Sequence, residues 1–208
     1  DGSIGPIDVI LQLRDAGIPV VFVEQGEDFE SAARSAQQVA DALGVSASGQ
    51  EYVKALYAQI NEVIAEIAKI APSDPDKKIR VAFLYIRGTA GIYYLFGKGS
   101  GADTMIEALG AIDVATEADW EGMRPMNAES FIALNPDLII LMTGGLKSVG
   151  GVEGLKEAVP AIALTKAGSN DRFVDMADSV VLSFGPRPPM MLHALAIAFY
   201  APEQSSVG

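Results

Sequence analysis

The feature that most constrains this chain is an apolar segment at residues 81–86 (VAFLYI), which lies between Arg80 and the pair Arg87 and Gly88. A charge-free run of this length that meets a glycine turn predicts a buried strand, over residues 79–86. A second segment of the same kind, residues 138–142 (LIILM), runs into two glycines. Strands buried on both faces are typical of parallel sheets covered by helices. The sequence therefore predicts an α/β fold with a largely parallel sheet, whose ligand site lies at the carboxyl ends of the strands.

Two polar-tipped side chains leave the end of the first strand together. Side chains alternate along a strand with a period of two, so Tyr85 and Arg87 project on the same side. A phenol has an ordinary pKa of about 10, and a fixed cation beside it favours the phenolate. Phenolate is a hard ligand that suits ferric iron, including ferric haem. Our central hypothesis is that Tyr85 ligates haem iron and that Arg87 holds this tyrosine in its anionic form.

The same spacing also has a structural interpretation. Tyrosine and arginine often lie at strand ends with an apolar body packed and a polar tip in water. Arg87 would then pair with a surface carboxylate, and Tyr85 would be a packing residue. The spacing alone leaves both interpretations open.

The rest of the chain predicts helices and short strands in alternation. The expected helices cover residues 3–16, 29–43, 49–70, 102–109, 151–158 and 189–200, with one more beginning at the N-cap Asn127. The other expected strands cover residues 18–23, 92–96, 161–164, 172–176 and 180–183, of which 92–96 forms a hairpin with the first strand. The polar stretch 71–76 (APSDPD) predicts a linker after the long helix.

Composition excludes several classes of protein. The chain has 208 residues, half of them hydrophobic, so it can bury a core as one domain or two small ones. No apolar run reaches the roughly 18 residues of a membrane span, and the absence of cysteine excludes disulfides and thiolate metal sites. A net charge of −12 argues against nucleic acid and makes capture of an anion depend on locally placed arginines. Because the chain opens at Asp1 with neither methionine nor signal peptide, we expect a processed piece.

Two further motifs are weak candidates for chemistry. The loop at residues 97–101 (GKGSG) resembles part of a phosphate-binding fingerprint, but its spacing is not G-x-G-x-x-G because position 102 is alanine. An α/β enzyme that binds phosphate there is the least favoured function. His193, the one histidine, lies in an apolar helix and is interpreted as a hydrogen-bonded packing residue.

Taken together, several segments resemble the substrate-binding proteins that feed vitamin B12, siderophore and haem importers. They are residues 2–6 (GSIGP), 16–21 (AGIPVV), 99–110 (GSGADTMIEALG), 135–140 (NPDLII) and 183–187 (SFGPR), along with the long helical connector. In that family two α/β lobes are joined by one long helix, and the ligand lies in the cleft between them. The resemblance implies that residues 1–26 are the remnant of the N-terminal lobe, 27–76 the helical connector and 77–208 the C-terminal α/β lobe.

Within this family, Tyr85 and Arg87 resemble the haemin-binding branch of the HmuT type. The resemblance implies a tyrosine of the second lobe on haem iron, an arginine that hydrogen-bonds it, and a first-lobe histidine as the opposite ligand. That histidine has no match here, because its segment would precede Asp1. The resemblance also supports Met142, at the end of a strand, and Met123, in a loop before Pro125, as pocket-wall residues.

The function implied is the extracytoplasmic binding of haem and its delivery to an ABC permease and its ATPase, without enzymatic activity. Such a protein is expected to be a monomer, and to be either a lipoprotein anchored to a Gram-positive membrane outside this segment or a periplasmic protein. The alternative within the family is a receptor for a ferric siderophore or vitamin B12, in which Tyr85 lines the site without touching the metal.

Overall fold

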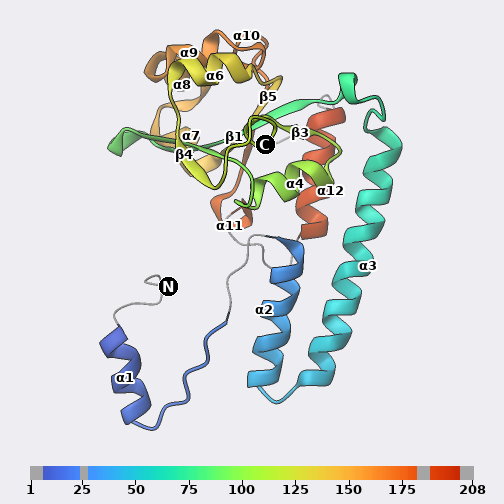
Figure 1. Cartoon of the computed structure of the whole chain (residues 1–208), viewed down its shortest axis with the longest axis vertical. Helices are drawn as coiled ribbons and strands as arrows, with labels where there is room; N and C mark the ends of the chain where they lie inside the picture. Colours follow the sequence, from blue (N-terminus) through green and yellow to red (C-terminus); the bar gives the residue numbers. More distant parts are fainter. Residues whose placement is uncertain (1–6, 24–27, 182–187, 202–208) are drawn as a thin grey trace.

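A computed structural model describes residues 7–23, 28–181 and 188–201 of the chain. A mixed sheet with helices on both faces forms its centre, and a pair of long helices extends from one side (Figure 1). This arrangement confirms the predicted α/β class. The sheet is mixed rather than largely parallel, because the hairpin partner of the central strand and the edge strand beyond it run antiparallel.

The central strand of the sheet is β1, Arg80–Arg87. It pairs antiparallel with β2, Ile92–Phe96, and parallel with β5, Leu138–Met142. Three shorter strands complete the sheet, β4 (Met123–Pro125) beside β2, β6 (Phe173–Met176) beside β5, and β3 (Ile112–Asp113) beside the start of β1. Strand β1 has a hydrogen-bonded neighbour on each edge. Its side chains project alternately from the two faces of the sheet.

The side chains on the two faces of β1 belong to two separate hydrophobic clusters. Val81 and Phe83 belong to the cluster formed with α3 (Ser46–Ile70), α4 (Ala102–Ala108) and α12 (Pro188–Tyr200). Ala82, Leu84 and Ile86 belong to the cluster on the opposite face. Helices there are α5 (Val114–Glu117), α6 (Ala128–Leu134), α8 (Gly151–Ala158), α9 (Pro160–Ala163) and α10 (Lys166–Ser169). Burial on both faces explains why this strand has no charged residue between its ends.

Helices α2 (Phe29–Ala42) and α3 form an antiparallel pair that extends away from the sheet (Figure 1). Asp28 begins α2 with a capping box, in which its carboxylate accepts the Ser31 backbone N–H at 2.6 Å. Gly44, in the left-handed region at φ 74°, makes the turn between the helices. The 25 residues of α3 span about 38 Å and pack on α12.

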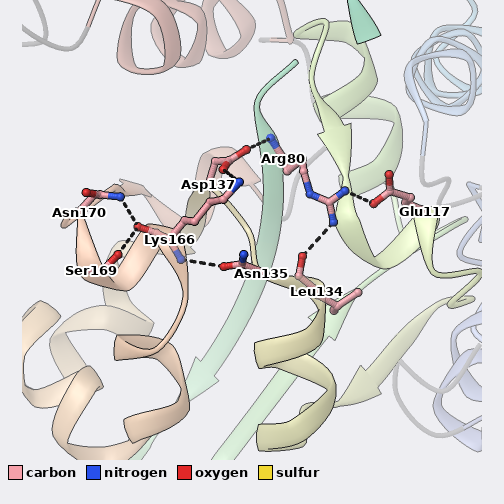
Figure 2. Close-up of polar contacts among 8 residues, drawn as sticks. All are labelled: Arg80, Glu117, Leu134, Asn135, Asp137, Lys166, Ser169 and Asn170. Carbon is pink, nitrogen blue, oxygen red and sulfur yellow. Dashed lines mark hydrogen bonds and ion pairs between the residues drawn. The ribbon is translucent and has the colours of Figure 1, made fainter. Parts of the chain in front are cut away.

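A polar network joins the amino-terminal ends of β1 and β5 to the helices around them (Figure 2). The Arg80 backbone N–H donates to the Asp137 carboxylate at 3.0 Å, and the Lys166 ammonium lies 3.1 Å from the same carboxylate. The Arg80 guanidinium pairs with Glu117 and donates to the Leu134 carbonyl at 2.9 Å. At this end of the sheet the charged groups are therefore held by partners within the protein.

Three predicted elements differ from the structure. Residues 18–23 form no strand, because the described chain offers them no neighbour to pair with, and Val21 and Phe22 are about half exposed. The segment predicted as a strand at 161–164 lies in α9, where Pro160 occupies the first helical turn. The strand predicted at 180–183 is replaced by α11, Asp178–Val181, and residues 182–183 lie outside the described residues. Short apolar runs of this kind fit either state, so the tertiary contacts decide.

The remaining helices lie at the chain start and after β5. They are α1 (Ile7–Asp15), which lies apart from the sheet in Figure 1, and α7 (Thr143–Ser148). Two short 3₁₀ turns, η2 (Pro75–Lys77) and η3 (Gly88–Ala90), precede and follow β1.

Asp113 provides a test of how burial contributes to the pH dependence of stability. It is buried at the start of α5, where its carboxylate accepts the backbone N–H groups of Ala115 and Thr116, yet desolvation outweighs these bonds and raises its pKa. The folded state therefore binds the proton more tightly than the unfolded state, so this group's contribution to stability falls as the pH rises from the ordinary value of 3.8 through the folded pKa. We expect Asp113→Asn to gain stability relative to the unmodified protein as the pH rises from 4 to 7. Urea unfolding of both proteins across this range measures the difference, and a difference independent of pH would contradict the argument.

Candidate functional site

Tyr85 and Arg87 meet on one side of the sheet at the carboxyl end of β1. The Arg87 guanidinium carbon lies 5.7 Å from the centroid of the Tyr85 ring, in cation–π geometry. Tyr85 is half-buried against the α3, α4 and α12 cluster, and Arg87 is exposed. The predicted juxtaposition of a phenol and a guanidinium is therefore present, with the guanidinium over the ring and not hydrogen-bonded to the hydroxyl.

An aromatic stack holds the Tyr85 ring from the neighbouring strand. Phe96 of β2 lies with its ring centroid 6.1 Å from that of Tyr85 at an interplanar angle of 25°, and 4.9 Å from that of Phe83. Phe83 is fully buried, so the stack is rooted in the core. Such pairs add about 0.5–1.5 kcal/mol beyond the area that they bury, which is enough to bias the ring toward one position.

Two glycines let α7 approach the end of β1 closely. A Cβ atom on Gly145 would lie 2.8 Å from the Ile86 carbonyl oxygen, and one on Gly88 would lie 2.8 Å from the Ser148 carbonyl oxygen. The Gly88 N–H donates to the Ser148 hydroxyl at 2.9 Å. These contacts are with backbone atoms that cannot move aside, so they fix the backbone on either side of Arg87.

A row of side chains crosses the sheet at the level of Tyr85. Tyr94 of β2 lies directly opposite Tyr85, and Pro125 of β4 lies opposite Tyr94. On the other edge, Leu84 pairs with Leu141, which places Met142 in the next position beside Tyr85, and Met142 pairs with Met176. Members of one row share a face of the sheet. At the carboxyl end of this face, two phenols and two thioethers therefore lie in one row, with the Met142 thioether buried in the core.

The two methionines predicted to line the site have different environments. Met142 is 3% exposed and belongs to the core cluster beneath Tyr85, whereas Met123 is 52% exposed. Met123 lies in β4, and not in a loop as predicted, and it pairs with Phe96, the residue that stacks on Tyr85. Both methionines thus share the Tyr85 face of the sheet, one as a core residue and one at the surface.

Polar groups at this end of the sheet contrast with the network at the other end. The hydroxyls of Tyr85 and Tyr94 and the guanidinium of Arg87 have no hydrogen-bond or ion-pair partner within residues 7–23, 28–181 and 188–201. The acidic side chains nearby are already bonded, Asp175 to the Thr143 hydroxyl at 2.6 Å and Asp178 to the Gly144 N–H at 2.9 Å. Asp175 also pairs with Leu141, whose side chain faces the opposite cluster. Tyr85, Tyr94 and Arg87 therefore remain available to a ligand.

The glycine loop is not available to a phosphate group in the same way. Its Gly99 and Gly101 N–H groups donate to the Asp103 carboxylate at 2.7 and 3.0 Å, and the Ser100 hydroxyl donates to the Gly97 carbonyl at 2.6 Å. A phosphate would have to displace a carboxylate that belongs to the same loop. The geometry thus disfavours the enzyme interpretation of this loop.

Other parts of the described chain offer less. Within it, no three His, Cys, Asp or Glu side chains cluster so as to hold a metal, and no helix has the length and apolar character to cross a membrane. An open groove of about 470 Å³ between α2 and α3 is lined by Arg34, Lys54 and Tyr57 among others, and it contains none of the predicted site residues. His193 is exposed on α12, so its interpretation as a packing residue is wrong.

Sequence reasoning missed Tyr94, Phe96 and Met176. The signal for the first two was present, because a hairpin that pairs Arg87 with Ile92 also pairs Tyr85 with Tyr94 by counting backwards. Met176 depended on the parallel pairing of β5 with β6, whose register no local pattern defines.

The chain has relatives among known proteins. The chain matches the periplasmic binding protein family over residues 5–180. It is 28% identical over 194 residues to YvrC of Bacillus subtilis strain 168, an uncharacterized ABC transporter substrate-binding lipoprotein. The aligned region covers 93% of this chain and 57% of that relative. The chain thus spans little more than half the length of the curated relative it matches.

Solved structures of haem-binding proteins resemble it closely. The periplasmic haem-binding protein RhuT from Roseiflexus sp. RS-1, in its apo form, superposes with a TM-score of 0.86 at 32% identity, over 96% of this chain and 73% of that one. The haem-binding protein HmuT superposes with a TM-score of 0.85 at 34% identity, over 97% of this chain and 64% of that one. HmuT has also been solved with a tyrosine, an arginine two residues after it, and a histidine each replaced by alanine.

The family match covers most of the chain, and the superpositions on the two solved structures cover nearly all of it. The chain belongs to the periplasmic binding protein family.

Proposed function

We propose that this protein binds ferric haem outside the cytoplasm and delivers it to an ABC permease and its ATPase, with the Tyr85 oxygen as an iron ligand. The observation that carries the proposal is the pairing of Tyr85 and Arg87 at the carboxyl end of β1, with polar tips that make no hydrogen bond or ion pair within the described residues. The relatives are substrate-binding proteins, which supports binding and delivery rather than catalysis.

Three further observations support haem as the ligand. RhuT and HmuT are named for haem binding, and each is more than 30% identical to this chain. The tyrosine and arginine replaced in HmuT have the spacing of Tyr85 and Arg87. The partly exposed side chains of the row, Tyr85, Tyr94 and Met176, are aromatic or apolar in their bodies, which suits contact with a flat macrocycle.

Each part of the site has a role in this proposal. The Tyr85 phenolate binds the ferric iron, and the Arg87 guanidinium compensates its negative charge. Met142 supports the site from the core and Met123 borders it at the surface. Residues 77–208 form the second lobe, 27–76 the connector and 1–26 the end of a first lobe, which supplies the opposite wall and the second axial ligand. The relative named as a lipoprotein supports a lipid anchor outside this segment.

Tyr85→Phe tests the ligand assignment. Ferric haem added to the full-length protein is expected to give the charge-transfer absorption of an iron-bound phenolate, and the substitution is expected to abolish this band and weaken haem affinity by at least roughly tenfold. The matched control is Tyr93→Phe, because Tyr93 is in the neighbouring strand and packs on the opposite face. An unchanged spectrum in Tyr85→Phe, or binding of a ferric siderophore in place of haem, would remove the assignment.

Arg87 is expected to control the charge state of the ligand rather than haem retention. With Arg87→Ala, haem should stay bound while the phenolate-to-iron band weakens, because the anion has lost its compensating cation. Arg87→Lys keeps the charge and should retain most of the band. Absorption spectra of the haem-loaded variants distinguish them, and a band indifferent to Arg87→Ala would assign the arginine a structural role.

The two methionines should respond differently to truncation. Met142→Ala removes a buried core side chain and is expected to lower the free energy of unfolding by about 2–5 kcal/mol. Met123→Ala alters an exposed side chain, so the unfolding free energy should change by less than about 0.5 kcal/mol while haem affinity falls. Urea unfolding and haem titration separate the two effects, and equal losses of stability would contradict the assigned environments.

A further inference from the structure

We infer that Tyr94 is a second functional phenol of this site, whose hydroxyl donates a hydrogen bond to the iron-bound oxygen of Tyr85. The inference rests on the proposed function and adds a residue to it. Tyr94 is a positioning residue in this scheme, because it acts on the iron through the oxygen of Tyr85.

The register of the hairpin brings the two phenols together. Tyr85 and Tyr94 are directly opposite each other in the antiparallel pair β1 and β2. Side chains at such positions leave the sheet on the same face, with Cβ atoms about 4.5–5.5 Å apart. Each phenol oxygen lies on the axis of its own Cβ–Cγ bond, so the χ1 angles of the two tyrosines set the distance between the hydroxyls.

The environment of Tyr94 leaves its side chain free for this role. Tyr94 is half-buried and belongs to neither hydrophobic cluster, whereas its neighbour Tyr93 packs on the cluster of the opposite face. The Tyr94 hydroxyl has no hydrogen-bond partner within the described residues, although tyrosine hydroxyls in partly buried positions usually find one. Pro125, opposite it in β4, carries no side-chain donor or acceptor that could engage the hydroxyl. A half-buried phenol whose hydroxyl has no hydrogen-bond partner among the described residues thus lies opposite the proposed iron ligand.

The chemistry of the pair fits an acceptor and a donor. A phenolate bound to iron keeps lone pairs that accept a hydrogen bond, and a neutral phenol is an O–H donor. Hydrogen bonds to a charged acceptor are shorter and about twice as strong as neutral ones. The Arg87 guanidinium and the Phe96 ring both contact the ring of Tyr85, and neither donates a hydrogen bond to its oxygen. Arg87 then supplies charge from above the ring, and Tyr94 supplies a directed hydrogen bond to the oxygen.

Tyr94→Phe in the full-length protein loaded with ferric haem tests this inference. Loss of the hydrogen bond raises the electron density on the phenolate oxygen, so the phenolate-to-iron charge-transfer band is expected to move to longer wavelength. Haem transfer to an excess of a haem-scavenging protein is expected to be roughly tenfold faster. Tyr93→Phe is the matched control, because it removes the same hydroxyl from the adjacent position on the opposite face.

The outcomes separate this inference from the proposed function. A band at the same wavelength and an unchanged transfer rate in Tyr94→Phe would overturn the role of Tyr94, and an equal shift in Tyr93→Phe would overturn it too. The proposed function survives both results as long as Tyr85→Phe abolishes the band. If haem-loaded protein has no such band before any substitution, the assignment of Tyr85 fails and the role of Tyr94 fails with it.

Discussion

The structure depends on the enclosure of β1 on all sides. Strands β2 and β5 satisfy its backbone hydrogen bonds on both edges, and separate apolar clusters cover its two faces. Between its two terminal arginines, Tyr85 is the sole residue with a polar side-chain group. Side chains alternate strictly between the two faces of a strand. Because Phe83 is buried on the α3 face, Tyr85 and Arg87 also lie on that face. The packing of the strand therefore determines the position of Tyr85, the proposed iron ligand, before any haem is bound.

The two ends of the central sheet differ in how their charges are satisfied. At the amino-terminal end, the Asp137 carboxylate bridges Arg80 and Lys166, and the Arg80 guanidinium is held by Glu117 and a carbonyl. At the carboxyl end, the nearby acids hold backbone and hydroxyl groups of α7, which leaves the guanidinium of Arg87 to the Tyr85 ring. This contrast among the described residues supports the site proposed at the carboxyl end. In open α/β sheets, ligands generally bind outside the carboxyl ends of the parallel strands.

Much of the fold could be predicted from the sequence because its main signals are local. The apolar run of β1, its glycine turn and the side shared by Tyr85 and Arg87 follow from periodicity alone, and Asn127 caps α6 as expected, accepting the Ser130 N–H at 2.8 Å. The failures lie where a short apolar segment depends on neighbours distant in sequence. Residues 161–164 are helical since Pro160 starts a turn, and residues 18–23 lack a strand to pair with among the described residues.

Registers explain why only part of the candidate site was predicted. Tyr94 follows from the hairpin by counting, but that count requires a hairpin with a fixed four-residue connection, and other loop lengths shift every pair. Met176 joins the row through a parallel pairing between segments that an intervening helical region separates. The exposure of Met123 and the burial of Met142 likewise come from the helices above the sheet, which no property of the methionines themselves indicates.

The net charge of −12 makes the placement of single cations decisive. An anionic ligand such as haem, with its carboxylates, meets a repulsive overall field, but salt screens that field beyond about 8 Å at physiological ionic strength. The Arg87 guanidinium lies within this screening distance of Tyr85, with its central carbon 5.7 Å from the centroid of the Tyr85 ring. One guanidinium at contact distance outweighs a diffuse excess of screened carboxylates, since Coulomb energy falls with distance and with the dielectric of the intervening water. In the proposed function, attraction of an anionic iron complex would therefore depend on the local geometry of β1 and β2 more than on the charge of the protein as a whole.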